Sequence, residues 1–244
     1  MMQIASDGEA AIRLIHAERD FLVLDKPAGI SVHGGPGVRG RTVADWIIER
    51  YPETKGVGDE PALRPGIVHR LDRNTSGVMI VARNQEAFEK LKQLFKDRRV
   101  EKTYLALVVG TPKRKIGVID APIGRMASNP TKRGTGPRVR GGRKAMTEYR
   151  TLERIGSYTL LEVKPKTGRM HQIRVHLASI GTPVAGDTSY GGTRTRIEHL
   201  DRQFLHAWRL AFSYPEGRRW QFDAPLPKDL KQILGHLRRL RKAG

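Results

Sequence analysis

Residues 69–77 are the most distinctive stretch of the chain, and they run His69-Arg70-Leu71-Asp72-Arg73-Asn74-Thr75-Ser76-Gly77. One acidic side chain, Asp72, lies between two arginines in a segment rich in turn-forming residues. Cations on both sides favour an ionised carboxylate. An ionised aspartate among cations is suited to nucleophilic attack on a substrate that is itself anionic. Asp72 is therefore the first candidate for a catalytic residue, although a turn aspartate is the simpler interpretation of this stretch alone.

The net charge indicates the class of partner. The 244-residue chain has 45 Lys and Arg against 25 Asp and Glu, which gives a formal net charge of +20. An enzyme of small anionic metabolites needs only a few cations, whereas this excess is typical of proteins that bind a polyanion, most often nucleic acid. The alternative is charge that serves solubility alone.

The absence of cysteine excludes several kinds of chemistry. It removes disulfides, thiolate nucleophiles and the Cys-ligated zinc of nucleobase deaminases. The first residues, Met1 to Glu9, carry acids where a signal peptide has bases, and no run of apolar residues is long enough to span a bilayer. These patterns predict a cytoplasmic protein that has no membrane partner.

The hydrophobic pattern predicts strands and helices without strict alternation. Strands are expected at 21–24, 78–82, 102–109, 145–152, 158–164, 207–213 and 219–223. Helices are expected after the Thr42 cap, at 86–98, through Ile173 and Leu177 to Gly181, and near 230–237. This mixture favours an α+β fold. Because we see no repeat and no domain boundary, we expect a single domain over residues 1–244.

Residues 126–143 are basic, rich in glycine and proline, and free of acidic residues. A solvated, mobile arm is one interpretation. The other is an arm that orders on nucleic acid, so that deleting 128–142 would weaken RNA affinity and flatten its salt dependence. The candidate contacts to an RNA backbone are Lys132, Arg133, Arg138, Arg140 and Arg143.

Two motifs suggest a cofactor or a metal, and neither has the context that such a site requires. Residues 35–40 match G-x-G-x-x-G but contain Pro36, and the strand and acid of a dinucleotide site do not follow. His171 and His176 are five positions apart rather than four, and no carboxylate lies at metalloprotease spacing. We expect neither a cofactor nor a metal.

Two further residues are candidates for a site that includes Asp72. Tyr104, near the start of an apolar run, offers an aromatic face for stacking on a base, although core packing is the commoner use. Arg174 lies beside the apolar face of its helix, so it can reach inward and then needs an anionic partner. Asp72 is a natural candidate for that partner, and the alternative is a solvated helix cation.

The chain resembles the RluA family of pseudouridine synthases, because the Asp72 segment is accompanied by four other motifs in order. They are Asp25-Lys26-Pro27-Ala28-Gly29 with Val32-His33; Lys102-Thr103-Tyr104; Thr167-Gly168-Arg169 through His176; and Gly186-Asp187 with Tyr190-Gly191. The likeness covers about residues 15–235.

The resemblance implies isomerisation of uridine to pseudouridine in RNA, without a cofactor. It implies a mixed, largely antiparallel sheet with flanking helices and a central RNA-binding cleft. Asp72 corresponds to the nucleophile, Tyr104 to the tyrosine that packs on the target base, and Arg174 to the arginine that pairs with the aspartate. Arg70 corresponds to the position that occupies the space left by the extruded base. The flanking motif residues His69, Arg169 and His171 are expected to support the site.

The resemblance leaves the target open. Residues 32–35 look more like the branch that modifies large-subunit rRNA than the tRNA branch. Asp25 begins its motif so early that an N-terminal S4 domain does not fit before it, and we expect a monomer that needs no protein partner. The alternative function is a non-catalytic RNA-binding or ribosome-assembly factor. It would have little reason to keep Asp72 in a groove that binds phosphate.

Overall fold

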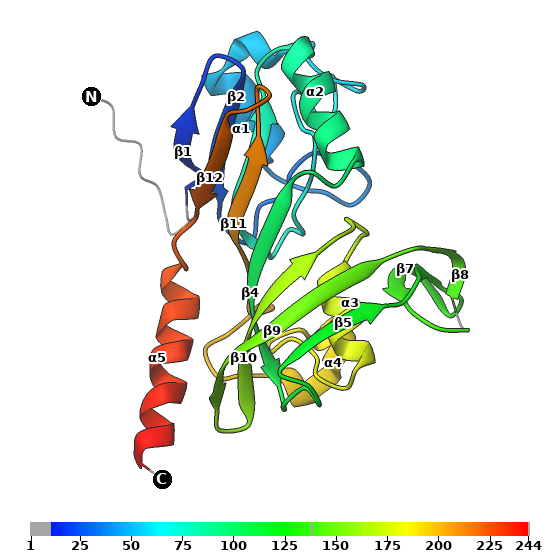
Figure 1. Cartoon of the computed structure of the whole chain (residues 1–244), viewed down its shortest axis with the longest axis vertical. Coiled ribbons are helices and arrows are strands. Elements are labelled where there is room, and N and C mark those ends of the chain that lie inside the picture. Colours follow the sequence, from blue (N-terminus) through cyan, green and yellow to red (C-terminus); the bar gives the residue numbers. More distant parts are fainter. Residues whose placement is uncertain (1–10, 138, 244) are drawn as a thin grey trace. The chain divides into compact units, whose positions relative to one another are not determined.

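The structure, a computed structural model, describes residues 11–137 and 139–243 (Figure 1). The expectations about Met1 to Glu9 and about the cation Arg138 therefore lie outside the described residues. The chain divides into two compact units, Met1–Leu91 and Lys92–Gly244. Their boundary falls inside helix α2 (Gln85–Lys96), which explains why the sequence has no linker-like composition there. The single-domain expectation stays a prediction.

The first unit is built on three antiparallel strands, β1 (Arg13–Ala17), β2 (Phe21–Lys26) and β3 (Ser76–Ala82). Every residue of β2 and β3 is buried. Strands covered on both faces have continuous apolar runs rather than alternation, which is why β2 and β3 were predictable from sequence. The short β1 alternates weakly and was missed.

Helix α1 (Val43–Arg50) covers this sheet and begins at the expected cap. The Thr42 hydroxyl accepts a hydrogen bond from the Asp45 N–H, and the Asp45 carboxylate accepts one from the Thr42 N–H at 2.8 Å. Its apolar side, which includes Trp46 and Ile47, packs against β2 and β3. A short 3-10 helix, η1 (Pro52–Thr54), follows.

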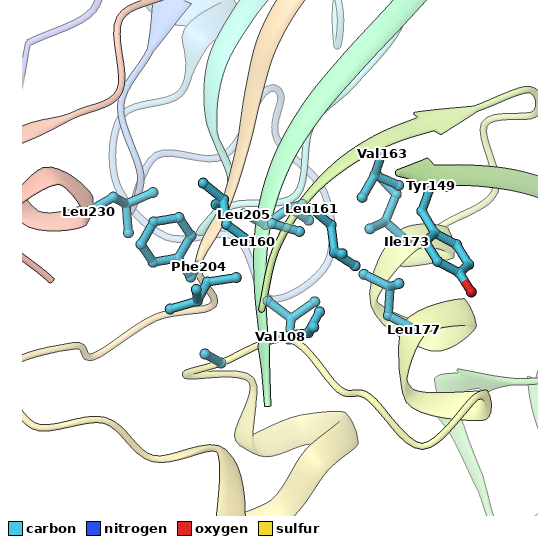
Figure 2. Packing of buried hydrophobic residues seen from close by; sticks show 14 of the residues in the cluster. Val108, Tyr149, Leu160, Leu161, Val163, Ile173, Leu177, Phe204, Leu205 and Leu230 are labelled. Carbon is cyan, nitrogen blue, oxygen red and sulfur yellow. The ribbon is translucent and has the colours of Figure 1, made fainter. Parts of the chain in front are cut away.

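The second unit has a larger antiparallel sheet in the order β12-β11-β4-β10-β9-β5. The strands are β4 (Glu101–Val109), β5 (Ile116–Asp120), β9 (Met146–Ile155), β10 (Tyr158–Pro165), β11 (Leu205–Ser213) and β12 (Arg219–Asp223). Buried side chains of β4, β10 and β11 form its core with Ile173 and Leu177 of helix α3 (Gln172–Ser179) (Figure 2). The predicted α+β class with a largely antiparallel sheet is confirmed.

Three further helical segments complete the second unit. They are α4 (Thr188–Gly191), η2 (Gly192–Thr195) and α5 (Lys228–Ala243). Helix α3 ends as predicted, with Gly181 after the cap at φ +83°. Among the described residues, no helix combines the length and apolar character needed to cross a bilayer.

The basic arm has regular structure, contrary to the loop expected from its glycines and prolines. Strands β6 (Ile123–Met126), β7 (Asn129–Gly134) and β8 (Val139–Arg143) form a separate antiparallel sheet in the order β7-β6-β8. In Figure 1, β7 and β8 lie beyond the ends of β5 and β9. Glycine is required at Gly124, because an added Cβ would lie 2.5 Å from the Arg140 carbonyl oxygen. Within the stretch that suggested a loop, a Cβ added at Gly134 would lie 2.2 Å from Met126 Sδ, so this glycine also permits close strand packing.

Candidate functional site

Asp72 lies in a turn just before β3, as its sequence suggested. The Thr75 N–H donates to the Asp72 carbonyl oxygen at 3.0 Å, and the Asp72 side chain is half-buried. Leu71 and Thr75 on either side of this turn are buried, at 4% and 2% exposure. The turn is therefore anchored at both ends, with Asp72 between the two anchors.

Lys26, at the end of β2, is hydrogen-bonded to the main chain of the Asp72 turn. Its side chain is completely buried, and Nζ donates to the carbonyl oxygens of Pro27 (2.7 Å), Ile30 (2.8 Å) and Arg73 (3.0 Å). Three donated hydrogen bonds match the donor capacity of an ammonium group. Because the third acceptor is the residue after Asp72, Lys26 fixes the main chain of the turn. In the sequence, only the motif of residues 25–29 marks Lys26.

A second connection joins the same two segments. The Gly29 N–H donates to the Arg73 carbonyl oxygen at 2.9 Å, and Arg73 Nε donates to the Gly29 carbonyl oxygen at 2.7 Å. Gly29 has φ +90°, a conformation that favours glycine. The Asp25-Lys26-Pro27-Ala28-Gly29 motif thus acts as a support for the Asp72 turn.

The other candidates in the first unit are also tied down. His69 Nε2 accepts from the Ile80 N–H at 3.0 Å, so His69 attaches the segment to β3. Arg70 is exposed, and its Nη1 lies 3.2 Å from His33 Nε2. Because arginine only donates, His33 Nε2 is the acceptor and its Nδ1 proton goes to the Gly34 carbonyl oxygen, 2.7 Å away.

Tyr104 lies in the middle of the large sheet of the second unit. It is half-buried on β4, opposite Val163 of β10 and Ala207 of β11, and it packs against the core. Lys102 lies two positions earlier on the same face, over the ring of Phe95 at 5.9 Å. Burial lowers the pKa of Lys102 to about 8.

Arg174 is buried, at 7% exposure, as predicted from its position beside an apolar helix face. Its Nε donates to Asp187 Oδ2 at 2.7 Å and its Nη2 to Asp187 Oδ1 at 2.8 Å. This two-bond arrangement fixes the orientation of the guanidinium group. Asp187 follows Gly186, where an added Cβ would lie 2.0 Å from the Arg202 carbonyl oxygen. No periodic pattern marks Asp187, and only the family motif could have found it.

Tyr190 and His171 extend the Arg174 site. The Arg174 guanidinium carbon lies 5.0 Å from the centre of the Tyr190 ring, within the range of a cation–π contact. The Tyr190 hydroxyl lies 2.7 Å from His171 Nδ1. His171 itself precedes α3 with φ +56°, an unusual conformation for a residue other than glycine. The structure thus brings together the predicted His171 and Arg174 through Tyr190.

Cations gather beside this site. Burial, together with repulsion from Arg143 and Arg98, lowers the pKa of the half-buried Arg169. In the arm, Lys132, Arg140 and Arg143 are exposed and Arg133 is half-buried. Guanidinium groups that repel one another are a suitable binding place for an anion such as a phosphate.

His176, the other histidine of the α3 motif, is a core residue. It is fully buried and lies 2.9 Å from the Thr147 hydroxyl and 3.0 Å from the Ala121 carbonyl oxygen. Burial lowers its pKa. Among the described residues no group of His, Asp and Glu side chains has the arrangement of a metal site.

Comparison with known proteins gives consistent matches. A family model described as RNA pseudouridylate synthase matches residues 20–179. An "Uncharacterized RNA pseudouridine synthase" of Chloroflexus aurantiacus is 49% identical over 214 residues, 87% of this chain and 65% of that protein. "Ribosomal large subunit pseudouridine synthase D" of Nitrosomonas europaea is 40% identical over 236 residues, 94% of this chain and 66% of that protein. The chain thus spans about two thirds of the length of these curated relatives.

Solved structures have the same fold. "Human RNA Pseudouridylate Synthase Domain Containing 4" matches with a TM-score of 0.73 at 27% identity, over 93% of this chain and 92% of that one. "Human RNA Pseudouridylate Synthase Domain Containing 1" also matches with a TM-score of 0.73, at 26% identity, over 96% of this chain and 98% of that one.

Proposed function

Because the chain belongs to the RNA pseudouridylate synthase family, we propose that it isomerises uridine to pseudouridine within RNA. The observation that carries the proposal is the family match over residues 20–179, which includes the anchored turn of Asp72. The C1′–N1 bond breaks, the uracil ring rotates, and C5 bonds to C1′. The proton on C5 leaves and N1 gains one. This balance needs no co-reactant, in keeping with the expectation of no cofactor.

We assign the nucleophile to Asp72, which attacks either C1′ or the uracil ring. Its place on an anchored turn supports this role, since a reacting group must be held in a defined orientation. Tyr104 is proposed to pack on the target base. The pairing of Arg174 with Asp72 that the family implies would join the two units and stays a prediction.

The target base must leave its stack before Asp72 can reach it, which costs a few kcal/mol. Contacts between cations and phosphates offset such a cost. We propose that the basic arm and the arginines around Arg169 supply these contacts. The roles of Arg70 and His69 follow the family in the same way, Arg70 occupying the space that the base leaves.

We propose large-subunit rRNA as the preferred substrate rather than tRNA. The support is the His33 segment and the printed name of the Nitrosomonas relative. Monomeric action and a cytoplasmic location remain predictions.

The test is tritium release from RNA that carries 5-tritiated uridine, with transcripts of large-subunit rRNA and of tRNA as parallel substrates. The proposal predicts release from rRNA at a higher rate than from tRNA. Faster release from tRNA would overturn the choice of substrate. Binding to both RNAs with no release from either would favour a non-catalytic RNA-binding factor.

A further inference from the structure

The arm carries a row of arginines across its three strands. In the register of the small sheet, Arg125 of β6 is paired with Arg133 of β7 and with Arg140 of β8. Residues directly opposite each other on antiparallel strands leave the same face of the sheet. Like charges in such positions destabilise a sheet, so an anionic partner would stabilise this row. Arg125 lies one position before the basic stretch of residues 126–143.

The base of this arm is docked on Tyr190. The Arg133 N–H donates to the Tyr190 hydroxyl at 3.1 Å, and Lys132 Nζ donates to the Ser189 carbonyl oxygen at 3.2 Å. The Tyr190 ring packs against a small buried cluster that contains Ile123 at the start of β6. A main-chain hydrogen bond and apolar contacts thus meet at Tyr190, and the Lys132 side chain contacts its neighbour Ser189.

Tyr190 also contacts Arg174 with its ring and His171 with its hydroxyl. Since the hydroxyl accepts from Arg133, its own proton is available for His171 Nδ1. Arg174 is in turn fixed by Asp187. A continuous set of contacts therefore runs from the arginine row to Arg174, entirely within the second unit.

We propose that Tyr190 is a positioning residue that sets the arginine row in register with Arg174, so that RNA held by its phosphates on the row presents its target nucleotide correctly. This inference rests on the proposed function, because it takes the anion to be RNA. It adds a specific phosphate-binding face and the residue that links that face to the site.

The test is a double-mutant cycle in the full-length chain. Tyr190→Phe keeps the ring and the Arg174 contact but removes the hydroxyl. Together, Arg125→Gln, Arg133→Gln and Arg140→Gln neutralise the row and leave the Arg133 main-chain N–H in place. Tyr158→Phe, at a half-buried tyrosine of β10, is the matched control. Both the rate of tritium release at limiting RNA and the RNA dissociation constant are measured.

In the unaltered background, Tyr190→Phe should lower the rate about tenfold and weaken RNA binding, while Tyr158→Phe changes neither by more than about twofold. With the row neutralised, Tyr190→Phe should cost less than about twofold, because a positioned row no longer exists. An equal loss in both backgrounds would overturn the proposal and leave the Tyr190 hydroxyl as a support of His171 alone. If the chain releases no tritium, the proposed function fails. The RNA dissociation constants of the same variants still test the coupling between Tyr190 and the arginine row.

Discussion

Both units of the molecule bury a cation beside a residue with a proposed role, and the two cations are held in different ways. Lys26 in the first unit donates to three main-chain carbonyl oxygens, and one of these belongs to the Asp72 turn. Arg174 in the second unit is neutralised by the carboxylate of Asp187. Lys26 therefore fixes the main chain of the Asp72 turn, whereas Asp187 fixes the side chain of Arg174.

The difference predicts different consequences of removing each partner. Without Asp187, the Arg174 charge would remain buried with no carboxylate beside it, which is costly. Without the Lys26 ammonium, carbonyl oxygens would lose a donor, which costs less per group but frees the main chain next to Asp72. The first change should act mainly on stability and the second mainly on reaction rate.

Asp187→Asn should have the largest effect on stability. We expect the free energy of unfolding to fall by about 3 kcal/mol, because the Arg174 charge stays buried after its carboxylate is lost. Denaturant unfolding of the full chain measures this. Asp223→Asn is the control, because Asp223 makes the same two-bond pair with Arg209 at 2.7 Å on a more exposed surface. The control should cost less than about 1 kcal/mol, and equal costs would contradict the account.

Lys26→Met should lower the free energy of unfolding by about 2 kcal/mol. It should slow single-turnover tritium release about a hundredfold, since small displacements of a reacting group have effects of this size. Thr54→Val is the control, because Thr54 is fully buried in the same unit and donates to the Tyr51 carbonyl oxygen. Rates are compared where both variants are folded. A normal rate in Lys26→Met would break the link between Lys26 and the Asp72 turn.

Lys102 of the second unit is a half-buried lysine whose folded-state pKa is lowered by burial, from 10.5 to about 8. Between these pH values the unfolded chain binds more protons than the folded one, so stability should rise with pH across this window. Lys102→Met should remove that rise and stabilise the protein by up to about 3 kcal/mol at pH 7. Unfolding measured from pH 7 to pH 10.5 tests this, and an unchanged profile would show that Lys102 is not the group responsible.

The sequence predicted the elements whose physical signals are local. The capping box at Thr42 and the buried runs of β2 and β3 follow from short-range patterns, as does the glycine after α3. Arg174 was expected to point inward because its helix face is apolar, and it does. Asp187 has no such signal, because its partner lies on another element and only folding brings them together.

In the arm, the local sequence pattern predicted a loop where the structure has strands. The arm's glycines and prolines are typical of a loop, yet residues 129–134 and 139–143 form strands that pair with β6, and the close approach at Gly134 leaves no space for a Cβ beside Met126. Lys26 was equally hard to interpret, since a lysine after an apolar strand is usually a surface residue. Its role depends on the carbonyl oxygens that a distant turn presents to it.

The most direct test of the central claim is the product formed by Asp72→Asn. Purified wild-type and variant chains are incubated with large-subunit rRNA, and the RNA is digested to nucleosides and separated by chromatography. RNA affinity is measured alongside. We expect pseudouridine from the wild-type chain, none from Asp72→Asn, and similar RNA affinity for both. Pseudouridine formed by the variant at the wild-type rate would contradict the assignment of Asp72 as the nucleophile.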